Sequence, residues 1–595
     1  MEGSVRHVIF ITLALGLFGF SLGGCKLDDN RLKGHVRGIP PPDELPPPEN
    51  PMLPCLDSIT IAEPETSTRL GWSTRVSGTC SNAQGPVMIS VGEDLAATID
   101  CDSNSFAGVL DIATVAPGTG TRILKFEQSE SCPAYVSVNK ENSDCDSMAN
   151  REKNLAEGLA GGDGTSVSPY IICTADQLNQ MRYGTASTFR YALKNDINFD
   201  HGDTNGDGVI DSNDSDYSNW NRIGPSTSDP FAARLYGNNF TIHNLTINTT
   251  TNDVGFLGFI RWGGRVNDLI FKNPNIKGGL GVGVLAAQNH YNGGGGGVSN
   301  IHVIGGVVEG AGRVGSIIGV AQTYITTCSS SATVIGTGES VGGITGIVGQ
   351  STLSHCIFTG RVEAPDRNNV GGITGDLAHF VTIRDSSFSG VVIGLDNVGG
   401  IAGVTYMGTA QIQRSHSSGT IIGRNQVGGI LGRNGWSTST PHRVSTSHAT
   451  SSAEVLGAGN NVGGIVGDNQ AIVNDSYSFA WVETEGQALG GAVGRNTGTI
   501  TNSYAAGPIN TEGTASGQIG GLVGSDNSGA GVTNNSFWDV TVTELGSDGS
   551  TADSEGGVGK STANMQQQST FDPPWDFTTF WEIHSGDYPR LQWEP

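Results

Sequence analysis

The chain has 595 residues, 89 of them glycine, and its 57 acidic and 32 basic side chains give a formal charge of −25. Glycine without a Gly-X-Y register excludes collagen, and it disfavours long helices because each interior glycine costs about 1 kcal/mol. The negative charge disfavours sequence-independent binding to phosphates and anionic lipids, so no nucleic-acid partner is expected.

Residues 1–24 predict a secretory signal peptide. Arg6 precedes an apolar run at residues 9–20, and small residues follow the run up to Cys25. A membrane-spanning helix is the alternative, but the run is shorter than the roughly 20 residues that such a helix needs.

The quartet Leu22-Gly23-Gly24-Cys25 resembles the lipobox of bacterial lipoproteins. The resemblance implies that Cys25 is lipidated and anchors the mature protein to a membrane. Lys26 stands where the inner-membrane retention signal of that family has Asp, so the resemblance implies the cell outer membrane if the host is Gram-negative. We expect a lipid-anchored protein that is exposed at the surface. Residues 25–54 contain two runs of three prolines, which is typical of an extended linker.

Residues 55–145 alternate short apolar runs with polar turns, which predicts an antiparallel β-sandwich of six or seven strands. The stretch from Val76 to Cys101 resembles bacterial immunoglobulin-like domains of surface proteins. With Cys25 set aside, eight cysteines remain, and an even number in an exported chain indicates disulfides. We expect Cys80 to pair with Cys101. Four others allow three pairings, among which the sequence does not choose: Cys55, Cys132, Cys145 and Cys173.

Residues 165–250 predict the entry coils of a solenoid. Thr174-Ala175-Asp176-Gln177 has the form of a capping box that opens a short helix through Met181. The loop at residues 203–214 has oxygen-bearing residues at positions 1, 3, 5, 9 and 12 and a glycine at position 6. This spacing matches the EF-hand calcium loop, except that position 12 is Asp instead of Glu, a variant that resembles dockerin-type modules.

The predicted cofactor is therefore Ca²⁺, which accepts hard oxygen ligands on a flexible loop. The expected ligands are Asp203, Asn205, Asp207, the carbonyl of Val209, Asp211 and Asp214. The alternative is an acidic surface loop that holds no metal.

Residues 251–540 are dominated by one short phrase, which recurs ten times at intervals of 27 to 35 residues. Its commonest form is Val-Gly-Gly-Ile-x-Gly. Each unit contains two or three short runs rich in Val, Ile and Thr, a pattern too β-branched for helical hairpins and too short for a propeller blade. A coil of about 28 residues with three short strands fits a right-handed parallel β-helix.

Within a copy, the pair Gly463-Gly464 is expected to bend the backbone at a coil corner, while Val462 and Ile465 fill the core. The repeat resembles the GLUG motif, best matched by Gly-Leu-Val-Gly at residues 521–524. The resemblance covers about residues 165–595 and implies a β-helix on a bacterial surface protein. It supplies no reaction.

Cys328 and Cys356 each precede a valine by six residues, so they occupy equivalent places in successive coils. Adjacent coils lie within the Cα spacing of a disulfide, and we expect these two cysteines to form one. Two stacked thiols are the alternative.

Residues 541–595 predict a C-terminal cap, as a solenoid requires. Ser561 is expected to begin a helix through Gln568. The aromatic residues from Trp575 to Trp593 are expected to plug the last coil, with a ligand platform as the alternative.

Catalytic signatures are weak. GLUG repeats accompany immunoglobulin-cleaving metallopeptidases, but none of the twelve histidines is followed by Glu, so the HExxH motif is absent. A β-helix lyase or glycosidase needs paired carboxylates, or a calcium–carboxylate cluster beside a base, in one groove. Arg384-Asp385 and Asp475 are isolated candidates, and their place at the Ser-aromatic phrase between copies favours a solvated coil edge.

The sequence thus predicts an all-β chain, an immunoglobulin-like β-sandwich followed by a right-handed parallel β-helix. We expect a monomeric, non-enzymatic lipoprotein for adhesion to, or recognition of, a glycan or protein ligand. A carbohydrate-active β-helix enzyme and a structural spacer are the alternatives. An enzyme needs a groove where charged side chains of neighbouring coils converge, whereas an adhesin needs an extended Ser/Thr/Asn surface.

Overall fold

The structure is a computed structural model that describes residues 59–594 with short gaps. The gaps are residues 65, 67–68, 93, 116–118, 130–131, 141–143, 201–202, 206–211, 291–295, 407–408, 436–444, 448, 512–517, 527–528 and 548–555. The predicted signal peptide, the linker, Cys25 and Cys55 lie outside the described residues. Strands account for 48% of the chain and helices for 7%, so the all-β fold class is confirmed.

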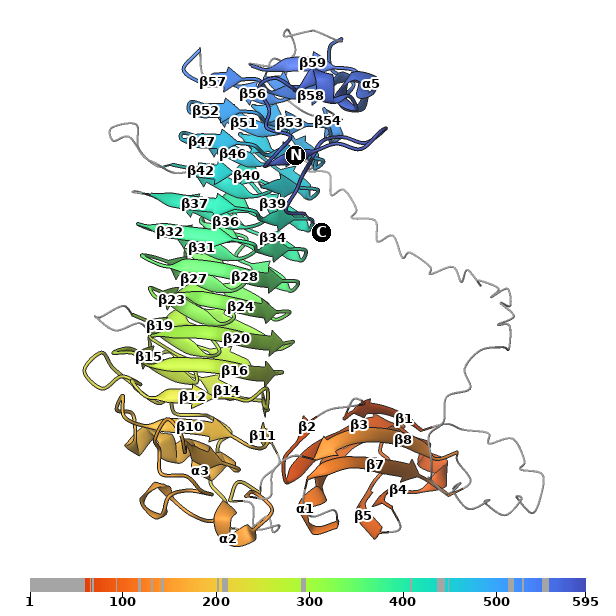
Figure 1. Ribbon diagram of the computed structural model, residues 1–595, viewed down its shortest axis with the longest axis vertical. Helices are drawn as coiled ribbons and strands as arrows, with labels where there is room; N and C mark the ends of the chain where they lie inside the picture. Colours follow the sequence, from red (N-terminus) through yellow and green to blue (C-terminus); the bar gives the residue numbers. More distant parts are fainter. Residues whose placement is uncertain are drawn as a thin grey trace, which may run out of the picture. The chain divides into compact units, whose positions relative to one another are not determined.

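Two small sheets come first in the chain, and a right-handed parallel β-solenoid of about ten turns follows (Figure 1). One small sheet joins β1 (Thr60–Glu63), β3 (Ser73–Thr79) and β6 (Ser105–Asp111). The other joins β2 (Arg69–Leu70), β8 (Ala134–Lys140), β7 (Gly120–Glu127), β4 (Val87–Val91) and β5 (Asp94–Ile99). The pairings are antiparallel except that of β2 with β8.

These sheets enclose one apolar core. In β4, the alternate residues Val87, Ile89 and Val91 are buried in it, as a strand with one covered face requires. Cys80 and Cys101 are disulfide-bonded, with their Cα atoms 6.0 Å apart, which is the pair that the sequence predicts.

Short helices lie between β8 of the sandwich and β10 (Arg190–Leu193) of the solenoid: α2 (Met148–Arg151), η2 (Leu155–Glu157), α3 (Ala175–Gln180) and η3 (Met181–Tyr183). The predicted cap of α3 is present, because Gln177 N donates to Thr174 Oγ1 at 3.2 Å. The reciprocal half of the capping box is absent. The Gln177 side chain instead accepts from Cys173 N at 2.9 Å and donates to Asn150 O at 2.7 Å.

The regular coils contain four strands up to β31 (Thr374–Leu377) and five from β32 (Val381–Arg384) on, where the sequence predicts three. One coil consists of β24 (Ile325–Ser330), β25 (Thr333–Gly336), β26 (Val341–Gly342) and β27 (Thr345–Val348). Equivalent strands of successive coils pair in parallel, so four sheets run along the solenoid, which we name by these four strands. The sequence does not predict a strand such as β26 because two residues are too few to show the alternation of apolar and polar side chains.

The interior of the solenoid is one continuous apolar cluster, which includes Val462 and Ile465 as predicted. A buried ladder of asparagines crosses three coils. Asn434 Nδ2 donates to Asn469 Oδ1, and Asn469 Nδ2 donates to Asn496 Oδ1, both at 2.8 Å. Because each amide satisfies the next, the ladder fixes the register of the coils.

Cys328 and Cys356 lie in register on β24 and β28 (Thr352–Phe358). They form the predicted disulfide between coils, with Cα atoms 4.5 Å apart. A covalent bond at this position links two successive coils inside the core.

The predicted bend at the glycine pair is present, between β45 (Val462–Gly463) and β46 (Val466–Asn469), but it uses no left-handed backbone at these glycines. Gly463 and Gly464 have no left-handed φ. A Cβ on Gly463 would lie 2.5 Å from Gly494 N and 2.8 Å from Ala492 O of the next coil, so glycine is required there by close backbone approach. The left-handed residue is instead the one before the valine, with φ of 65° at Ser340, 62° at Asn369 and 64° at Asn461. Asn tolerates this conformation because its side chain bonds locally.

The serine of the Ser-aromatic phrase joins successive coils. Ser476 Oγ donates to Asn474 O, and Ser503 Oγ accepts from Ser476 N at 3.2 Å. The same contact recurs one coil further on, where Ser536 Oγ accepts from Ser503 N at 3.1 Å. These serines therefore complete backbone hydrogen bonding at a bend in the β24 sheet.

The C-terminal segment contains α4 (Val540–Thr543), β59 (Val558–Lys560), α5 (Thr562–Met565), η4 (Gln568–Thr570), β60 (Trp581–Glu582) and β61 (Arg590–Leu591). The helix after Ser561 ends at Met565, three residues earlier than predicted, and the Ser561 side chain makes no cap bond. The aromatic residues pack on Tyr477, Tyr504 and Phe537, which are in register on three successive coils. The cluster thus covers the side of the last coils, not only the last coil.

Candidate ligand-binding face

The outer side of the β24 sheet carries a long column of polar residues, which we call the polar column. Parallel pairing places equivalent side chains of adjacent coils about 4.8 Å apart. Neighbours in the column contact each other: Ser299 Oγ donates to Asn267 Oδ1 at 3.0 Å, and Ser354 Oγ donates to Thr326 Oγ1 at 3.2 Å. The members are Asn267, Ser299, Thr326, Ser354, Arg384, Gln413, Asn474, Thr501 and Asn534. Ser354 is buried, with an exposed fraction of 4%, and the other members are at least partly exposed.

All members except Arg384 are uncharged. This is the extended Ser/Thr/Asn surface that the sequence analysis associates with recognition. Each hydroxyl and amide offers both a donor and an acceptor, so the column repeats the same hydrogen-bonding groups from coil to coil.

A second column on the same sheet contains two histidines. His302 Nδ1 lies 2.7 Å from Ser329 Oγ, and its Nε2 lies 2.9 Å from Asn300 Oδ1. His416 Nδ1 lies 2.6 Å from Thr450 Oγ1. Burial lowers the pKa of both imidazoles below the ordinary value of 6.5, so both are neutral at pH 7. They act as hydrogen-bonding groups of the coil surface.

The two catalytic candidates from the sequence have structural partners. Asp385 lies between Arg414, whose Nε is 2.6 Å from Oδ1, and Arg384, whose NH1 is 2.7 Å from Oδ2. The hydrogen bond from Arg414 keeps the pKa of Asp385 below its ordinary value despite partial burial, and Arg384 adds to this. A general acid would need the opposite shift. Asp475 accepts from Asn502 Nδ2 and from Trp581 Nε1, both at 3.3 Å, so it holds the C-terminal segment.

Asp376 is a buried carboxyl that the sequence analysis does not identify. It lies in β31 (Thr374–Leu377) of the β27 sheet, in register with Ile347 and Val404, and its exposed fraction is 5%. Burial raises its pKa to about 7, although Ser340 Oγ donates to its Oδ2 at 2.5 Å and lowers it. A carboxyl between two apolar neighbours in register, Ile347 and Val404, is the signal that could have identified it.

The predicted calcium loop is described only at its ends, since Asp207, Val209 and Asp211 lie outside the described residues. Asp214 Oδ1 accepts from Thr204 N at 2.7 Å and from Asn205 N at 3.4 Å. Thr204 O accepts from Asp176 N at the start of α3. The loop is thus closed on itself and joined to α3. In the described part of the chain, no group of three or more His, Cys, Asp and Glu is placed to hold a metal, and Ca²⁺ binding stays a prediction.

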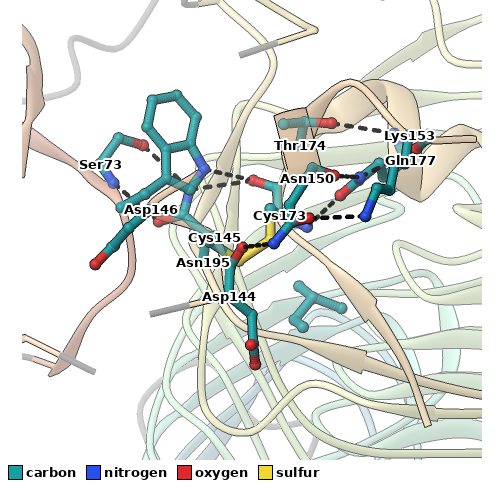
Figure 2. The surroundings of a disulfide bond; sticks show 12 residues. Ser73, Asp144, Cys145, Asp146, Asn150, Lys153, Cys173, Thr174, Gln177 and Asn195 are labelled. Atoms are coloured by element: carbon teal, nitrogen blue, oxygen red, sulfur yellow. Dashed lines mark hydrogen bonds between the residues drawn. A yellow bond between two sulfur atoms is a disulfide. The ribbon is translucent and has the colours of Figure 1, made fainter. Parts of the chain in front are cut away.

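A disulfide lies where the chain passes from the sandwich to the solenoid (Figure 2). Cys145 pairs with Cys173, with Cα atoms 5.5 Å apart, which selects one of the three open pairings. Cys132 is also disulfide-bonded. Beside the bond, Trp72 Nε1 of the sandwich donates to Cys173 O at 2.8 Å, and the Arg151 guanidinium lies 4.1 Å from the Trp72 ring centroid.

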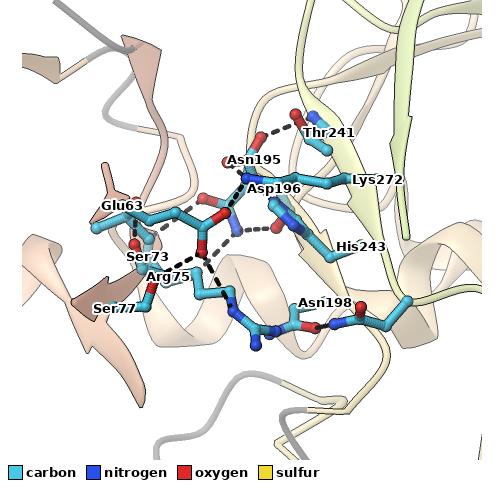
Figure 3. A network of polar contacts seen from close by, with 12 residues as sticks. Glu63, Ser73, Arg75, Ser77, Asn195, Asp196, Asn198, Thr241, His243 and Lys272 are labelled. Carbon is cyan, nitrogen blue, oxygen red and sulfur yellow. Dashed lines mark hydrogen bonds and ion pairs between the residues drawn. The ribbon is translucent and has the colours of Figure 1, made fainter. Parts of the chain in front are cut away.

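Close to the disulfide, charged side chains form a network (Figure 3). The carboxylate of Glu63 contacts Lys272 Nζ and lies 3.3 Å from Arg75 Nε. Burial alone would raise the pKa of Glu63, but the hydrogen bond and charge of Lys272 bring it below the ordinary value. His243 Nε2 lies 3.7 Å from Asp196 Oδ2. These five residues line a cavity of about 310 Å³.

Comparisons with known proteins identify no family. No protein-family model matches the chain. Halomucin of Haloquadratum walsbyi is 30% identical over 177 residues, which are 29% of this chain and 2% of halomucin. A candidate Gly-rich membrane protein of Evansella cellulosilytica is 30% identical over 151 residues, which are 25% of this chain and 13% of that protein. The chain therefore spans a small part of each relative.

Among solved structures, a candidate immunoglobulin A1 protease from Bacteroides ovatus is similar, with a TM-score of 0.30 and 18% identity. The match covers 73% of this chain and 95% of that chain. Within the described residues, no helix has both the length and the apolar character needed to cross a membrane.

Proposed function

We propose that this protein is a non-enzymatic surface lipoprotein whose β-solenoid recognises an extended glycan or protein ligand through the polar column. The observation that supports this most is the column itself, in which uncharged hydrogen-bonding groups repeat in register over successive coils. A repeating row of this kind suits an extended ligand because contacts of the same type recur at each step along it.

The rigidity of the face also supports recognition. The Cys328–Cys356 disulfide and the asparagine ladder fix neighbouring coils relative to each other. A ligand then does not have to order the surface that it binds, which lowers the entropic cost of association.

Two further parts of the proposal rest on sequence patterns. Cys25 carries the lipid that anchors the protein to the outer membrane, as its lipobox implies. The loop at residues 203–214 binds Ca²⁺, and the contacts of Asp214 with Thr204 support a loop that closes on itself. Calcium would stabilise the first coils.

Binding to an array of neutral and charged glycans and of surface proteins tests the proposal. We expect a ligand whose binding is lost in the double variant Gln413→Ala/Thr501→Ala, whose two residues lie on coils away from the first ones. The matched control is Lys277→Ala/Glu363→Ala, which changes two outward residues of the β25 sheet and leaves the net charge unchanged. A ligand that binds both variants equally well, or no ligand at all, would refute recognition by the polar column and favour a spacer.

A carbohydrate-active enzyme is the second candidate, and one observation favours it. The cavity of about 310 Å³ described above brings the carboxylates of Glu63 and Asp196 together with the imidazole of His243 (Figure 3). Release of reducing sugar from polysaccharides, measured with and without EDTA, distinguishes the two candidates. Activity that disappears in Asp196→Asn would establish the enzyme and contradict the adhesin.

A further inference from the structure

Three arginines stack on the first coils of the solenoid. Arg190 begins β10 (Arg190–Leu193), Arg234 begins β12 (Arg234–Tyr236) and Arg265 begins β16 (Arg265–Lys272). The register pairs Arg190 with Arg234 and Arg234 with Arg265. The next residue on each strand is fully buried, so the arginines point to the outside: Tyr191, Leu235 and Val266. Equivalent positions are about 4.8 Å apart, which places three positive charges in one row.

Two of these charges are not balanced by a described acidic residue. Arg190 NH1 donates to the backbone oxygens of Ser187 and Phe189, and neither Arg190 nor Arg234 forms an ion pair with a residue that the structure describes. Asp163 is close to Arg190 along the coil, because Arg190 N donates to Gly164 O. Its carboxylate, however, accepts from Thr165 N at 3.0 Å.

Elsewhere in the same solenoid, stacked arginines alternate with aspartates. Asp468 lies in register between Arg433 and Arg495, with Arg495 NH2 2.7 Å from its Oδ2 and Arg433 Nε 3.5 Å from it. Asp385 contacts Arg384, which precedes it in the chain, and Arg414 of the next coil. Like charges directly opposite in a sheet destabilise it. The unbalanced charges of Arg190 and Arg234, which are in register, therefore carry a cost that the column of Arg433, Asp468 and Arg495 avoids.

We propose that the arginine ladder, Arg190, Arg234 and Arg265, is a binding site for the sulfate or carboxylate groups of an acidic polysaccharide. The planar guanidinium binds such oxyanions through two parallel hydrogen bonds, and a row of three arginines matches a chain with several such groups. At Arg190 and Arg234 the oxyanions take the place that Asp468 takes between Arg433 and Arg495. The ladder lies next to Asn267, the first member of the polar column, but none of its three arginines belongs to the column.

The surroundings of the ladder suit a sugar chain. Tyr236 and Asn267 lie beside it, two residues further along their strands. The next position in the arginine column is Gly297, and the ring of Tyr324 lies where a Cβ of this glycine would be. Trp262 at the coil corner is 49% exposed and has a φ of 52°, which is rare for a bulky residue. Exposed aromatic rings provide flat apolar surfaces next to the charges.

The test compares Arg234→Gln with Arg424→Gln. Both variants lose one positive charge, but Arg424 is paired with Asp396 away from the ladder. Binding of the full chain to a sulfated, a uronic acid and a neutral polysaccharide is measured at low and high salt. We expect the affinity for at least one acidic polysaccharide to fall about tenfold or more in Arg234→Gln and to stay unchanged in Arg424→Gln. High salt should weaken binding of the wild type. The two acidic polymers show which oxyanion is preferred.

Thermal unfolding separates binding from a structural role. Without anion, Arg234→Gln should raise Tm because it removes repulsion, and added inorganic sulfate should raise the Tm of the wild type but not of the variant. A lower Tm in the variant, with the same response to sulfate as the wild type, would overturn the proposal. Equal binding of neutral and acidic polysaccharides would do so as well. If single-stranded DNA binds as tightly as the acidic polysaccharides, and Arg234→Gln abolishes this binding, the ladder binds polyanions in general and the polysaccharide proposal is overturned. The polar-column variants retain all three arginines, so the two proposals can fail independently.

Discussion

The substitution Asp376→Asn should make the β27 sheet more stable at neutral pH. In the folded chain, burial raises the pKa of Asp376 from 3.8 to about 7. Between these values the native state keeps a proton that the unfolded chain releases, so the free energy of unfolding falls as the pH rises. A difference of about three in pKa, at 1.36 kcal/mol each, gives a loss of about 4 kcal/mol that is complete above pH 7. Asn is neutral at every pH and avoids this loss.

Hydrogen exchange of the β31 amides, corrected for the intrinsic pH dependence of exchange, measures the local free energy of opening from pH 4 to pH 8. The advantage of Asp376→Asn over the wild type should be near zero at pH 4 and grow to about 4 kcal/mol above pH 7. Asp385→Asn is the matched control with the opposite sign. The lowered pKa of Asp385 means that the wild-type ion pair stabilises the fold above the unfolded pKa and is lost as the pH falls. An advantage of Asp376→Asn that does not change with pH would refute the reasoning.

Three further outcomes are expected. Replacing Cys328 and Cys356 with Ser should lower the free energy of unfolding by about 3 to 4 kcal/mol in urea titrations, because the bond closes a loop with a sequence separation of 28. As the control, Ser at Cys80 and Cys101 should leave the unfolding transition of the solenoid in place. Asn469→Leu should cost about 2 to 4 kcal/mol, since it leaves the amides of Asn434 and Asn496 without their partner, and an unchanged midpoint would contradict the ladder. Calcium should raise the Tm of the wild type and EDTA should lower it, while Asp214→Ala should have the same Tm in calcium and in EDTA. A wild-type Tm that changes with neither calcium nor EDTA would exclude the site.

Much of the fold could be predicted because the repeat is regular. Copies spaced by one coil place equivalent residues on top of each other, so Val462 and Ile465 in the core and the Cys328–Cys356 bond follow from counting. Two-residue strands and the left-handed residue before each valine could not be predicted, because neither leaves a hydrophobic period. The ionisation of Asp376 could not be predicted either, since it depends on what covers the carboxyl.

The spacing of the repeat phrase does not predict which residues are in register where the coils are irregular. Arg190, Arg234 and Arg265 are separated by 44 and 31 residues, and the ten copies of the repeat phrase begin only at Val254. Their register is visible only through the pairing of β10, β12 and β16. The same holds for Glu63 and Lys272, which are 209 residues apart in sequence and in contact in the folded chain.

The sequence by itself determined the solenoid, its core positions and the bond between two coils, because a periodic chain repeats its local interactions at each turn. The tertiary structure decided which charges meet, which glycines are required by a neighbouring backbone, and that the C-terminal aromatic residues cover the side of three coils. Those features depend on distances between segments that have no common period, and such distances are set only when the whole chain packs.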